Sequence, residues 1–510
     1  MPSFSGISLA LQSVLTHQQA IEVIQHNVAN ASTPGYHRQE AVLRPGPNQG
    51  AAGLVASTLS GKVGTGVVLS QVKRFNLDYM DTRYRSEVAN TKRWEVESDF
   101  MTQVEGALNE TGTTGINAKL DAFWTGWKSV STDPEDTALR ASLLEAGKQL
   151  ASAFNGRMED LTQIQNDADL KIYQNVDEIN QLAQQVANLN LEIGRFANES
   201  TQPNDFLDEQ ARYLDRLAEL AGAKIVFEDN GQAMVSLAGH VLVQGGTGYS
   251  LVAEENKDNA NMVDVKWNEP GDRYLYKYTE NGEYLDKYIT SGELAGLFEV
   301  RDVVISGEKD NLNGLAYTIF TNINSVHSAG YGLEGDSAST TNFFLLGEGT
   351  TSDTINSALS IKVNPTLDDV TKIRAAQSQG VSGDGRNAEL IFKFQTQSTH
   401  IYVTDPDYPD IPLTTPYKEL SIEDNINHAN SQRVAEFGLT VQKINTLEKQ
   451  HSNLTDVMDQ QRESVNGVSL DEEAANLVKY QRSYQASIRL MTTVDEMLDR
   501  IINNMGLAGR

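Results

Sequence analysis

The fold is decided by one stretch of the sequence, LDEEAANLVKYQRSYQASIRLMTTVDEMLDRIINNM, which occupies residues 470–505. Positions on one face recur at alternating intervals of four and three residues, which is typical of an amphipathic α-helix. This face consists of Leu470, Ala474, Leu477, Gln481, Tyr484, Ile488, Met491, Asp495, Leu498, Ile502 and Met505. Ser469 precedes the stretch and Glu472 follows Ser469 by three residues, so we expect a capping box at the helix start. Because an isolated amphipathic helix is marginal in water, this face requires a partner.

The beginning of the chain carries a second stripe with the same spacing. Its apolar members are Ile7, Leu11, Val14, Ile21 and Val28, and Gln18 and Gln25 fill the gaps. We therefore expect the two terminal helices to pair like a coiled coil, with residues 1–45 and 467–510 forming one assembly domain. The polar residues in the stripes, which include Gln481 and Asp495, would set the register of the pair. The alternative is that each helix docks separately on the body of the same subunit.

A turn motif follows the first helical pattern. The pattern ends at Asn30, and Thr33-Pro34-Gly35-Tyr36 comes next. Proline presets φ at the first central position of a turn, and glycine tolerates the positive φ of the second. We therefore expect a type II turn, after which the chain continues in an extended conformation through residues 39–43.

Helical periodicity continues between the two ends of the chain. It predicts helices over about 76–105, 137–200, 204–221, 292–328 and 437–458. These helices would form an elongated bundle that is built from both halves of the sequence, residues 46–222 and 291–466, with the chain running out and back.

Residues 223–290 change to the alternating period of β-strands. Two turn signals, Asp229-Asn230-Gly231 and Asn281-Gly282, separate alternating runs and predict hairpins. We therefore expect a mainly α-helical protein with an outer β domain inserted at the far end of the bundle. Residues 331–418 are mixed in character, and we expect strands at 359–363 and 388–394 within them.

The charge of the chain is large and unevenly distributed. Among 510 residues, 41 Lys and Arg oppose 69 Asp and Glu, for a net charge of −28. Residues 1–93 carry a net charge of +4 and residues 470–510 carry −1, so residues 94–469 carry −31. This surplus argues against broad binding of nucleic acid or anionic membranes, since phosphates would be repelled. The near-neutral ends could pack against copies of themselves, while the acidic middle faces water.

The sequence offers no persuasive site for catalysis. It contains no cysteine, which excludes disulfides, thiolate metal sites and cysteine nucleophiles. The eight histidines show no metal-binding spacing, and we interpret His451, on a helical stripe, as a packed core histidine. The acidic run 405–410 lacks the glycine and the final glutamate of a helix–loop–helix calcium site. We predict no catalytic, cofactor-binding or metal-binding residues and therefore no enzymatic activity. An extracellular hydrolase, the alternative, would need its catalytic residues within 223–290 or 331–418.

Membrane insertion and cleaved export are also not expected. No apolar run approaches about 18 residues, which a membrane-spanning helix requires. The first Lys or Arg is Arg38, so the sequence lacks the charged start of a cleavable signal peptide.

Two motifs, one near each end, resemble a known family. Residues 29–39, ANASTPGYHRQ, resemble the signature of bacterial flagellar rod, hook and hook-associated proteins. The stretch 467–477, GVSLDEEAANL, with 480–486, YQRSYQA, resembles more narrowly the hook-associated proteins of the hook–filament junction. Shorter resemblances lie at 291–297 and 324–333. A rod-type or hook-type axial subunit remains an alternative, and a type III translocator or adhesin is a more distant one.

The resemblance implies a structural subunit that polymerises at the hook–filament junction of the flagellum. It implies that the joined terminal helices line the axial tube, the bundle forms the wall and the β domain projects outward. The implied partners are copies of the same chain, the hook protein, a second junction protein and an export chaperone on the C-terminal helix. The implied location is extracellular, after type III export without signal cleavage. No cofactor is implied.

Overall fold

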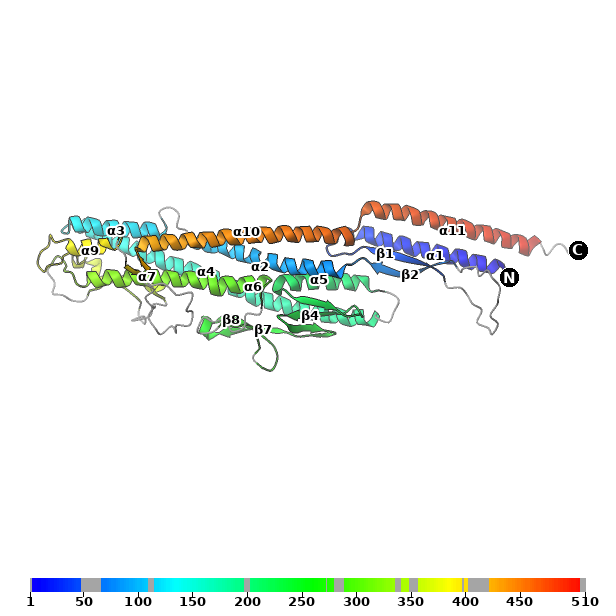
Figure 1. Ribbon diagram of the computed structural model, residues 1–510, viewed down its shortest axis with the longest axis horizontal. Coiled ribbons are helices and arrows are strands. Elements are labelled where there is room, and N and C mark those ends of the chain that lie inside the picture. Colours follow the sequence, from blue (N-terminus) through cyan, green and yellow to red (C-terminus); the bar gives the residue numbers. More distant parts are fainter. Residues whose placement is uncertain are drawn as a thin grey trace.

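The protein is elongated, and both ends of the chain lie at the same end of the molecule (Figure 1). The structure is a computed structural model that describes residues 2–46, 66–108, 114–196, 202–271, 273–278, 289–334, 341–347, 356–396, 399–401 and 422–504. The turn signal at Asn281-Gly282, the acidic run 405–410 and Met505 lie outside the described residues.

The two terminal helices lie side by side, as expected for a coiled-coil-like pair. These are α1 (Pro2–Ala29) and α11 (Leu470–Asn504), and they are in contact along the tip of the molecule (Figure 1). After α1, the strands β1 (Gln39–Pro45) and β2 (Val67–Arg74) form an antiparallel pair that packs against it. The extended conformation predicted after the turn is therefore confirmed, and the terminal helices do not dock separately on the body.

Long helices from both halves of the chain form the body. They are α2 (Asp78–Leu108), α3 (Ile116–Thr132), α4 (Thr137–Phe196), α5 (Asn204–Ala221) and α10 (Ile426–Asn466). The 60 residues of α4 extend for roughly 90 Å at 1.5 Å per residue. α10 returns along α2 and leads into α11, so the chain runs out and back as predicted (Figure 1).

Polar contacts join α10 to α2. The hydroxyl oxygens of Thr91 and Thr455 lie 2.7 Å apart, and the Ser98 hydroxyl donates to Asn445 Oδ1 at 2.6 Å. On α10, apolar burial is concentrated towards its start, at Phe437, Val441 and Ile444. Beyond this apolar part, hydrogen bonds help to fix the register of the returning helix against α2.

An aromatic cluster fills the end of the body that is distant from the termini. Phe123 and Trp127 of α3 pack against Phe343, and Phe123 also contacts Trp124 and Phe344; all five side chains are fully buried. Aromatic rings bury large apolar areas, so this cluster is a major part of the core.

The helix predicted over 292–328 is interrupted. It consists of α6 (Glu293–Phe298), a π-helical turn (Glu299–Val304) and α7 (Ile305–His327). In the π-helical turn, the consecutive residues Arg301 and Asp302 are both directed into one buried cluster. A regular α-helix would separate consecutive side chains by about 100°, so the wider turn accompanies their convergence.

The β region forms two antiparallel sheets. The first has the order β3-β4-β5-β6 and the second has the order β7-β8-β9. The strands are β3 (Lys224–Phe227), β4 (Ala233–Leu237), β5 (His240–Gln244), β6 (Thr247–Gly248), β7 (Leu251–Asn256), β8 (Met262–Trp267) and β9 (Tyr274–Tyr276). The predicted hairpin at Asp229-Asn230-Gly231 joins β3 to β4. The sheets pack along α4, beside α5 and α6, and not at the far end of the bundle as expected (Figure 1).

The mixed segment corrects both of its predicted strands. Residues 388–394 belong largely to a helix, α9 (Arg386–Lys393), in which Ala388 and Ile391 are buried at helical spacing. Residues 359–363 contain the end of α8 (Ser357–Ser360) and only a two-residue strand, β11 (Lys362–Val363). The other short strands are β10 (Phe344–Leu345), which pairs with β11, and β12 (Thr399–Ile401), which pairs with β13 (Ile422–Asp424).

We predict a stability loss in acid that depends on His327. Its fully buried ring bonds to Thr341 O at 2.8 Å and accepts from Arg374 N at 3.1 Å, and burial lowers its pKa to about 4. As the pH falls from 6.5 towards 4, the unfolded chain gains a proton that the folded chain does not, which removes about 3 kcal/mol of stability. Urea unfolding followed by tryptophan fluorescence should show this slope, because Trp127 contacts the ring.

His327→Gln should flatten this part of the pH profile, whereas His428→Gln, at an exposed position, should leave it unchanged. The difference between variants is needed because burial raises the pKa of Asp264 and of Asp310 to about 6, which gives a slope of opposite sign. Equal slopes for the wild type and His327→Gln would contradict the assignment.

Candidate assembly interface

The seam between α1 and α11 uses small and polar side chains. A Cβ added to Gly6 would lie 3.3 Å from Val494, and the hydroxyls of Ser13 and Ser487 lie 2.9 Å apart. The rings of His17 and Tyr480 are 6.1 Å apart between centroids. On α1 the series with four-and-three spacing is therefore Gly6, Ala10, Ser13, His17, Ala20, Ile24 and Asn27. Small residues at the seam allow the two backbones to approach closely.

The predicted apolar stripe of α1 begins one residue later and so flanks this seam. Ile7, Val14 and Ile21 are partly buried, whereas Leu11 is 46% exposed and Val28 is 44% exposed. One residue corresponds to a rotation of about 100° around the helix. The expectation that this stripe forms the pairing face within one subunit is therefore corrected: the less apolar neighbouring face forms it.

The predicted stripe of α11 lies closer to the seam. Leu498 is buried, and Leu477, Tyr484, Ile488 and Met491 are partly buried. Leu470 is 57% exposed, and the side chain of Ile502 lies outside the described part of the chain. The polar interruptions Gln481 and Asp495 are exposed.

The turn motif has the predicted geometry. The Tyr36 amide donates to Thr33 O at 3.2 Å, and Gly35 has φ of +75°. Asn30 Nδ2 donates to His26 O at 3.0 Å and thereby caps the last turn of α1. Glycine is required at position 35 because its φ lies in the left-handed region. The turn directs the chain back onto α1.

Asn27 connects the turn to both terminal helices. Its Oδ1 accepts from the Tyr36 hydroxyl at 2.8 Å and from the Gln39 amide at 3.0 Å. Its Nδ2 donates to Gln39 O at 2.8 Å and to Glu473 Oε2 at 3.1 Å. The Asn27 side chain is fully buried, so these four bonds satisfy an amide that would otherwise be costly to bury.

Arg38 completes the connection to α11. Its Nε donates to Glu473 Oε1 at 2.8 Å and its Nη1 donates to Glu472 Oε2 at 2.7 Å. Glu473 is 2% exposed, whereas the side chain of Glu472 is 62% exposed. Ser469 caps α11 by accepting from the Glu472 amide at 3.4 Å. We call Asn27, Arg38 and Glu473 the terminal clamp; it joins residues of the two motifs that lie at opposite ends of the sequence.

A second set of contacts ties the turn to the body. Arg74 Nε donates to Asp208 Oδ1 of α5 at 2.6 Å, and His37 Nδ1 lies 2.8 Å from the same oxygen. The Arg38 amide donates to Asn466 O at 2.8 Å. Burial, with the nearby carboxylate of Asp208, raises the pKa of Tyr36, so its hydroxyl remains a donor. The terminal clamp is therefore fixed to the body as well as to the two helices.

The polar side chains of this region make structural hydrogen bonds and ion pairs between the terminal helices and the body. Among the described residues, histidines and carboxylates do not gather in a group of three that could hold a metal ion. His451 does not lie in an apolar core as expected: its Nδ1 lies 2.6 Å from Glu87 Oε1, and its ring stacks on Trp94. No helix in the described parts combines the length and apolar character that a membrane crossing requires.

The terminal clamp was only partly visible in the sequence. Arg38 and Glu473 lie within the two motifs, but sequence reasoning assigned them no contact, and it did not select Asn27. The available signal was the series of small and polar residues one position before the apolar stripe.

Family comparisons agree with this architecture. Residues 101–344 match the family described as the helical domain of flagellar hook-associated protein FlgK, and residues 459–505 match the C-terminal family of flagellar basal body rod FlgEFG proteins. A flagellar hook-associated protein 1 of Bacillus subtilis (strain 168) is 26% identical over 524 residues, which cover 100% of this chain and 99% of the relative. The protein of that name from Escherichia coli (strain K12) is 22% identical over 560 residues, covering 98% and 99%.

A solved structure shares the fold. The flagellar hook junction protein FlgK from Burkholderia pseudomallei aligns with a TM-score of 0.62 and 13% identity over 76% of this chain and 100% of that one. The family matches and the relatives together place the resemblance among axial proteins of the bacterial flagellum. Within that class, the full-length resemblance is to flagellar hook-associated protein 1, and residues 101–344 match its helical domain.

We predict that Glu473→Gln loosens the terminal helices. The change removes the buried negative charge that pairs with Arg38, and the pairing of the two helices should lose about 1–3 kcal/mol of stability. Hydrogen exchange in α1 and α11 should therefore become about tenfold faster or more. Glu472→Gln is the matched control; its exposed pair is worth about 1 kcal/mol or less. Equal effects of the two variants, measured by hydrogen exchange with mass spectrometry, would contradict the clamp.

We predict that Gly35→Val misdirects the chain after α1. Valine at φ of +75° is strained, and a Cβ at this position would lie 2.6 Å from Arg212 Cγ. In the wild type, the Gln39 amide donates to Asn27 Oδ1. The variant should lose this bond, so hydrogen exchange at the Gln39 amide should become rapid. Gly239→Val serves as control because Gly239 also has a positive φ, of +83°, but has open space around it. Wild-type protection in Gly35→Val would refute the role of the turn.

Proposed function

We propose that the chain is a structural subunit of the bacterial flagellum that polymerises at the hook–filament junction and links hook to filament through its terminal helices. One observation carries the proposal: the two motifs from opposite ends of the sequence meet in the terminal clamp at Asn27, Arg38 and Glu473. The clamp makes α1 and α11 one rigid unit, and such a unit can present a fixed surface to neighbouring copies.

Large apolar side chains on this unit are left for contacts between subunits. They are Leu11, Leu15, Val28, Leu470, Val478, Leu490 and Met497, each between 44% and 58% exposed. Burial of apolar area is worth about 25 cal/mol per Å², and contacts repeated around a closed ring accumulate. The small and polar seam holds the helices together within a subunit, and the apolar flanks drive polymerisation.

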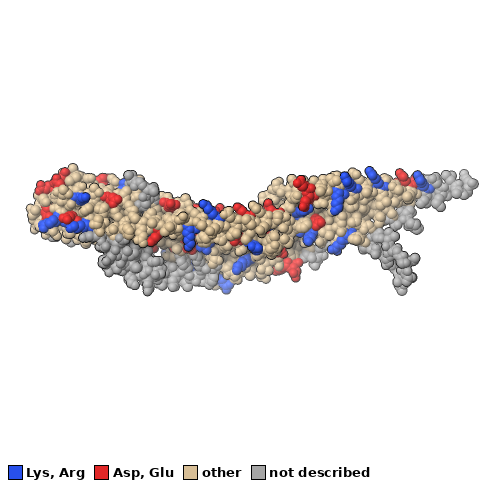
Figure 2. Space-filling model, turned by 45° about the horizontal axis from the view of Figure 1, so that its top comes forward, with Lys and Arg blue, Asp and Glu red and all other residues tan. Residues whose placement is uncertain are grey.

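The charge distribution supports an orientation in which the terminal helices face the axis of the assembly and the body faces water. On the face shown in Figure 2, Lys and Arg side chains are interspersed with Asp and Glu along the terminal helices. Residues 470–510 have a net charge of −1, whereas residues 94–469 have −31. Neutral ends can pack closely in the axial tube, while acidic bodies repel one another and face water, with the β sheets projecting outward.

The partners follow from the place in the flagellum. We propose copies of the same chain, the hook protein on one side and a second junction protein on the other. Before assembly, Val478, Leu490 and Met497 of α11 are uncovered. An export chaperone would cover these side chains until type III export, without signal cleavage, delivers the chain outside the cell. The match of 459–505 to rod proteins is consistent with a terminal module shared by axial subunits, so a rod or hook position is the second candidate.

Leu11→Asp should block assembly without unfolding the subunit. Leu11 is 46% exposed, so a charge there costs the isolated chain little but would be buried between subunits. When this variant is expressed in cells that lack the gene, the cells should carry intact hooks that have no filaments. Flagellin should then be released into the medium. Leu170→Asp is the matched control because Leu170, on α4, is 56% exposed outside the terminal unit.

Sedimentation and thermal unfolding of the purified variants separate assembly from folding. Both variants should melt like the wild type, and Leu170→Asp should restore motility. Normal filaments in cells that carry Leu11→Asp would count against the proposed packing. Loss of hooks as well would favour a hook or rod position.

A further inference from the structure

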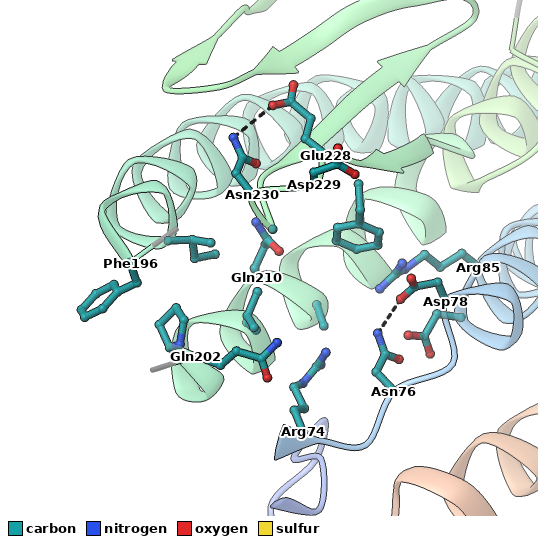
Figure 3. Close-up of a pocket in the computed structure, with 17 residues that line it drawn as sticks. Arg74, Asn76, Asp78, Arg85, Phe196, Gln202, Gln210, Glu228, Asp229 and Asn230 are labelled. Carbon is teal, nitrogen blue, oxygen red and sulfur yellow. Dashed lines mark hydrogen bonds between the residues drawn. The ribbon is translucent and has the colours of Figure 1, made fainter. Parts of the chain in front are cut away.

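A cavity of 410 Å³ lies where the terminal region meets the body. It is bordered by the start of α2, by α5, by the end of α4 and by the β3–β4 turn. In Figure 3, Arg74 and Arg85 approach it from one side, Glu228, Asp229 and Asn230 lie at the opposite rim, and Gln210 lies between them. We call this space the joint cavity. The terminal clamp does not line it.

The joint cavity contains buried acceptors without donors. Asp81 is 3% exposed, and its Oδ1 has no hydrogen-bond partner among the described residues. Asn76 Oδ1 is also buried without a partner among the described residues. The other end of that side chain, Nδ2, donates to Asp78 Oδ1. Buried polar atoms are ordinarily satisfied, because an acceptor that has lost its water without gaining a donor destabilises the folded state. Both orphaned atoms are acceptors, so an occupant that satisfies them must donate hydrogen bonds.

The charge of the lining favours a cation. Four carboxylates line the joint cavity, those of Asp78, Asp81, Glu228 and Asp229. The two lining arginines are already paired with other carboxylates: Arg74 Nε lies 2.6 Å from Asp208, and Arg85 Nε lies 2.6 Å from Asp215. Asp215 also pairs with Arg462 at 2.8 Å, so Arg85 is only partly neutralised. Four carboxylates against two arginines still leave the lining with an excess of negative charge.

Aromatic rings supply the remaining chemistry. Phe196 and Phe227 line the joint cavity, and an aromatic face attracts a cation that lies over it. Arg85 already lies over one face of Phe227, 5.9 Å from the ring centroid. Burial raises the pKa of Asp81, as is usual for a carboxyl without a cation in direct contact, although Arg85 acts in the opposite direction. A flat cation with several N–H groups could bond to Asp81 and Asn76 while it stacks on a ring.

We propose that the joint cavity binds an alkyl cation with N–H donors, the guanidinium or ammonium end of a basic side chain or of a free amine. The site does not depend on the proposed function. A ligand in the joint cavity would lie beside the contacts that join the terminal region to the body.

Isothermal titration of the full chain with n-butylguanidinium tests the proposal. Saturable binding is expected, weakened roughly tenfold by Asp81→Asn, which keeps the volume but removes the charge. Glu145→Gln, at an exposed carboxylate of α4, is the control and should bind like the wild type. n-Butyltrimethylammonium, which has the charge but no N–H donor, should bind about tenfold more weakly than the guanidinium.

Absence of saturable binding, or equal binding by wild type and Asp81→Asn, would overturn the proposal. So would equal affinity for the two cations. Near-UV circular dichroism checks the fold of Asp81→Asn; if that variant does not fold, Asp229→Asn at the rim replaces it and should also weaken binding. If excess n-butylguanidinium slows polymerisation of the wild type, a neighbouring copy supplies the cation; if polymerisation is unaffected while binding persists, a free amine supplies it.

Discussion

The buried carboxylate of Glu473 is the interaction on which the arrangement of the terminal helices depends. A carboxylate that is 2% exposed is tolerated only when hydrogen bonds and an opposite charge compensate its desolvation. Asn27 and Arg38 provide both, and they come from residues 446 and 435 positions away in the chain. If the helices slid along each other by one turn, Glu473 would lose these partners. The polar contact therefore specifies a single register, which apolar packing alone does not.

This division of roles explains why the pairing face is the less apolar one. The seam combines Gly6, Ser13 and Ser487 with the buried Ala10, Ala20 and Ile24, and its small residues permit close approach of the two helices. The more apolar flanks, with Leu11 at 46% exposed, are left uncovered in one subunit. If the apolar stripes were buried within the subunit, the isolated chain would be more stable. Less apolar area would then remain to be buried against neighbouring copies. In the proposed assembly, this choice leaves apolar area for neighbouring copies rather than for the stability of the isolated chain.

The sequence predicted the parts of the fold that local periodicity determines. The helix at 204–221 has the predicted bounds, and the turn at Gly35 has the predicted positive φ, because both follow from residues close in the chain. The terminal clamp and the joint cavity were not predictable in this way, since their partners are brought together only by the out-and-back path. The predicted strand at 388–394 failed because a short apolar run is compatible with both periods, and burial of Ala388 and Ile391 selects the helix.

Polar contacts also transmit the orientation of the terminal unit to the body. The backbone of Arg38 bonds to Asn466 at the end of α10, while Asp208 of α5 holds Arg74. The turn and the β1–β2 pair thus contact the terminal helices on one side and two helices of the body on the other. Because the connections on both sides are hydrogen bonds with fixed directions, the angle between tip and body is defined before assembly. A subunit with a defined angle can add to a tube without the entropic cost of ordering a flexible joint.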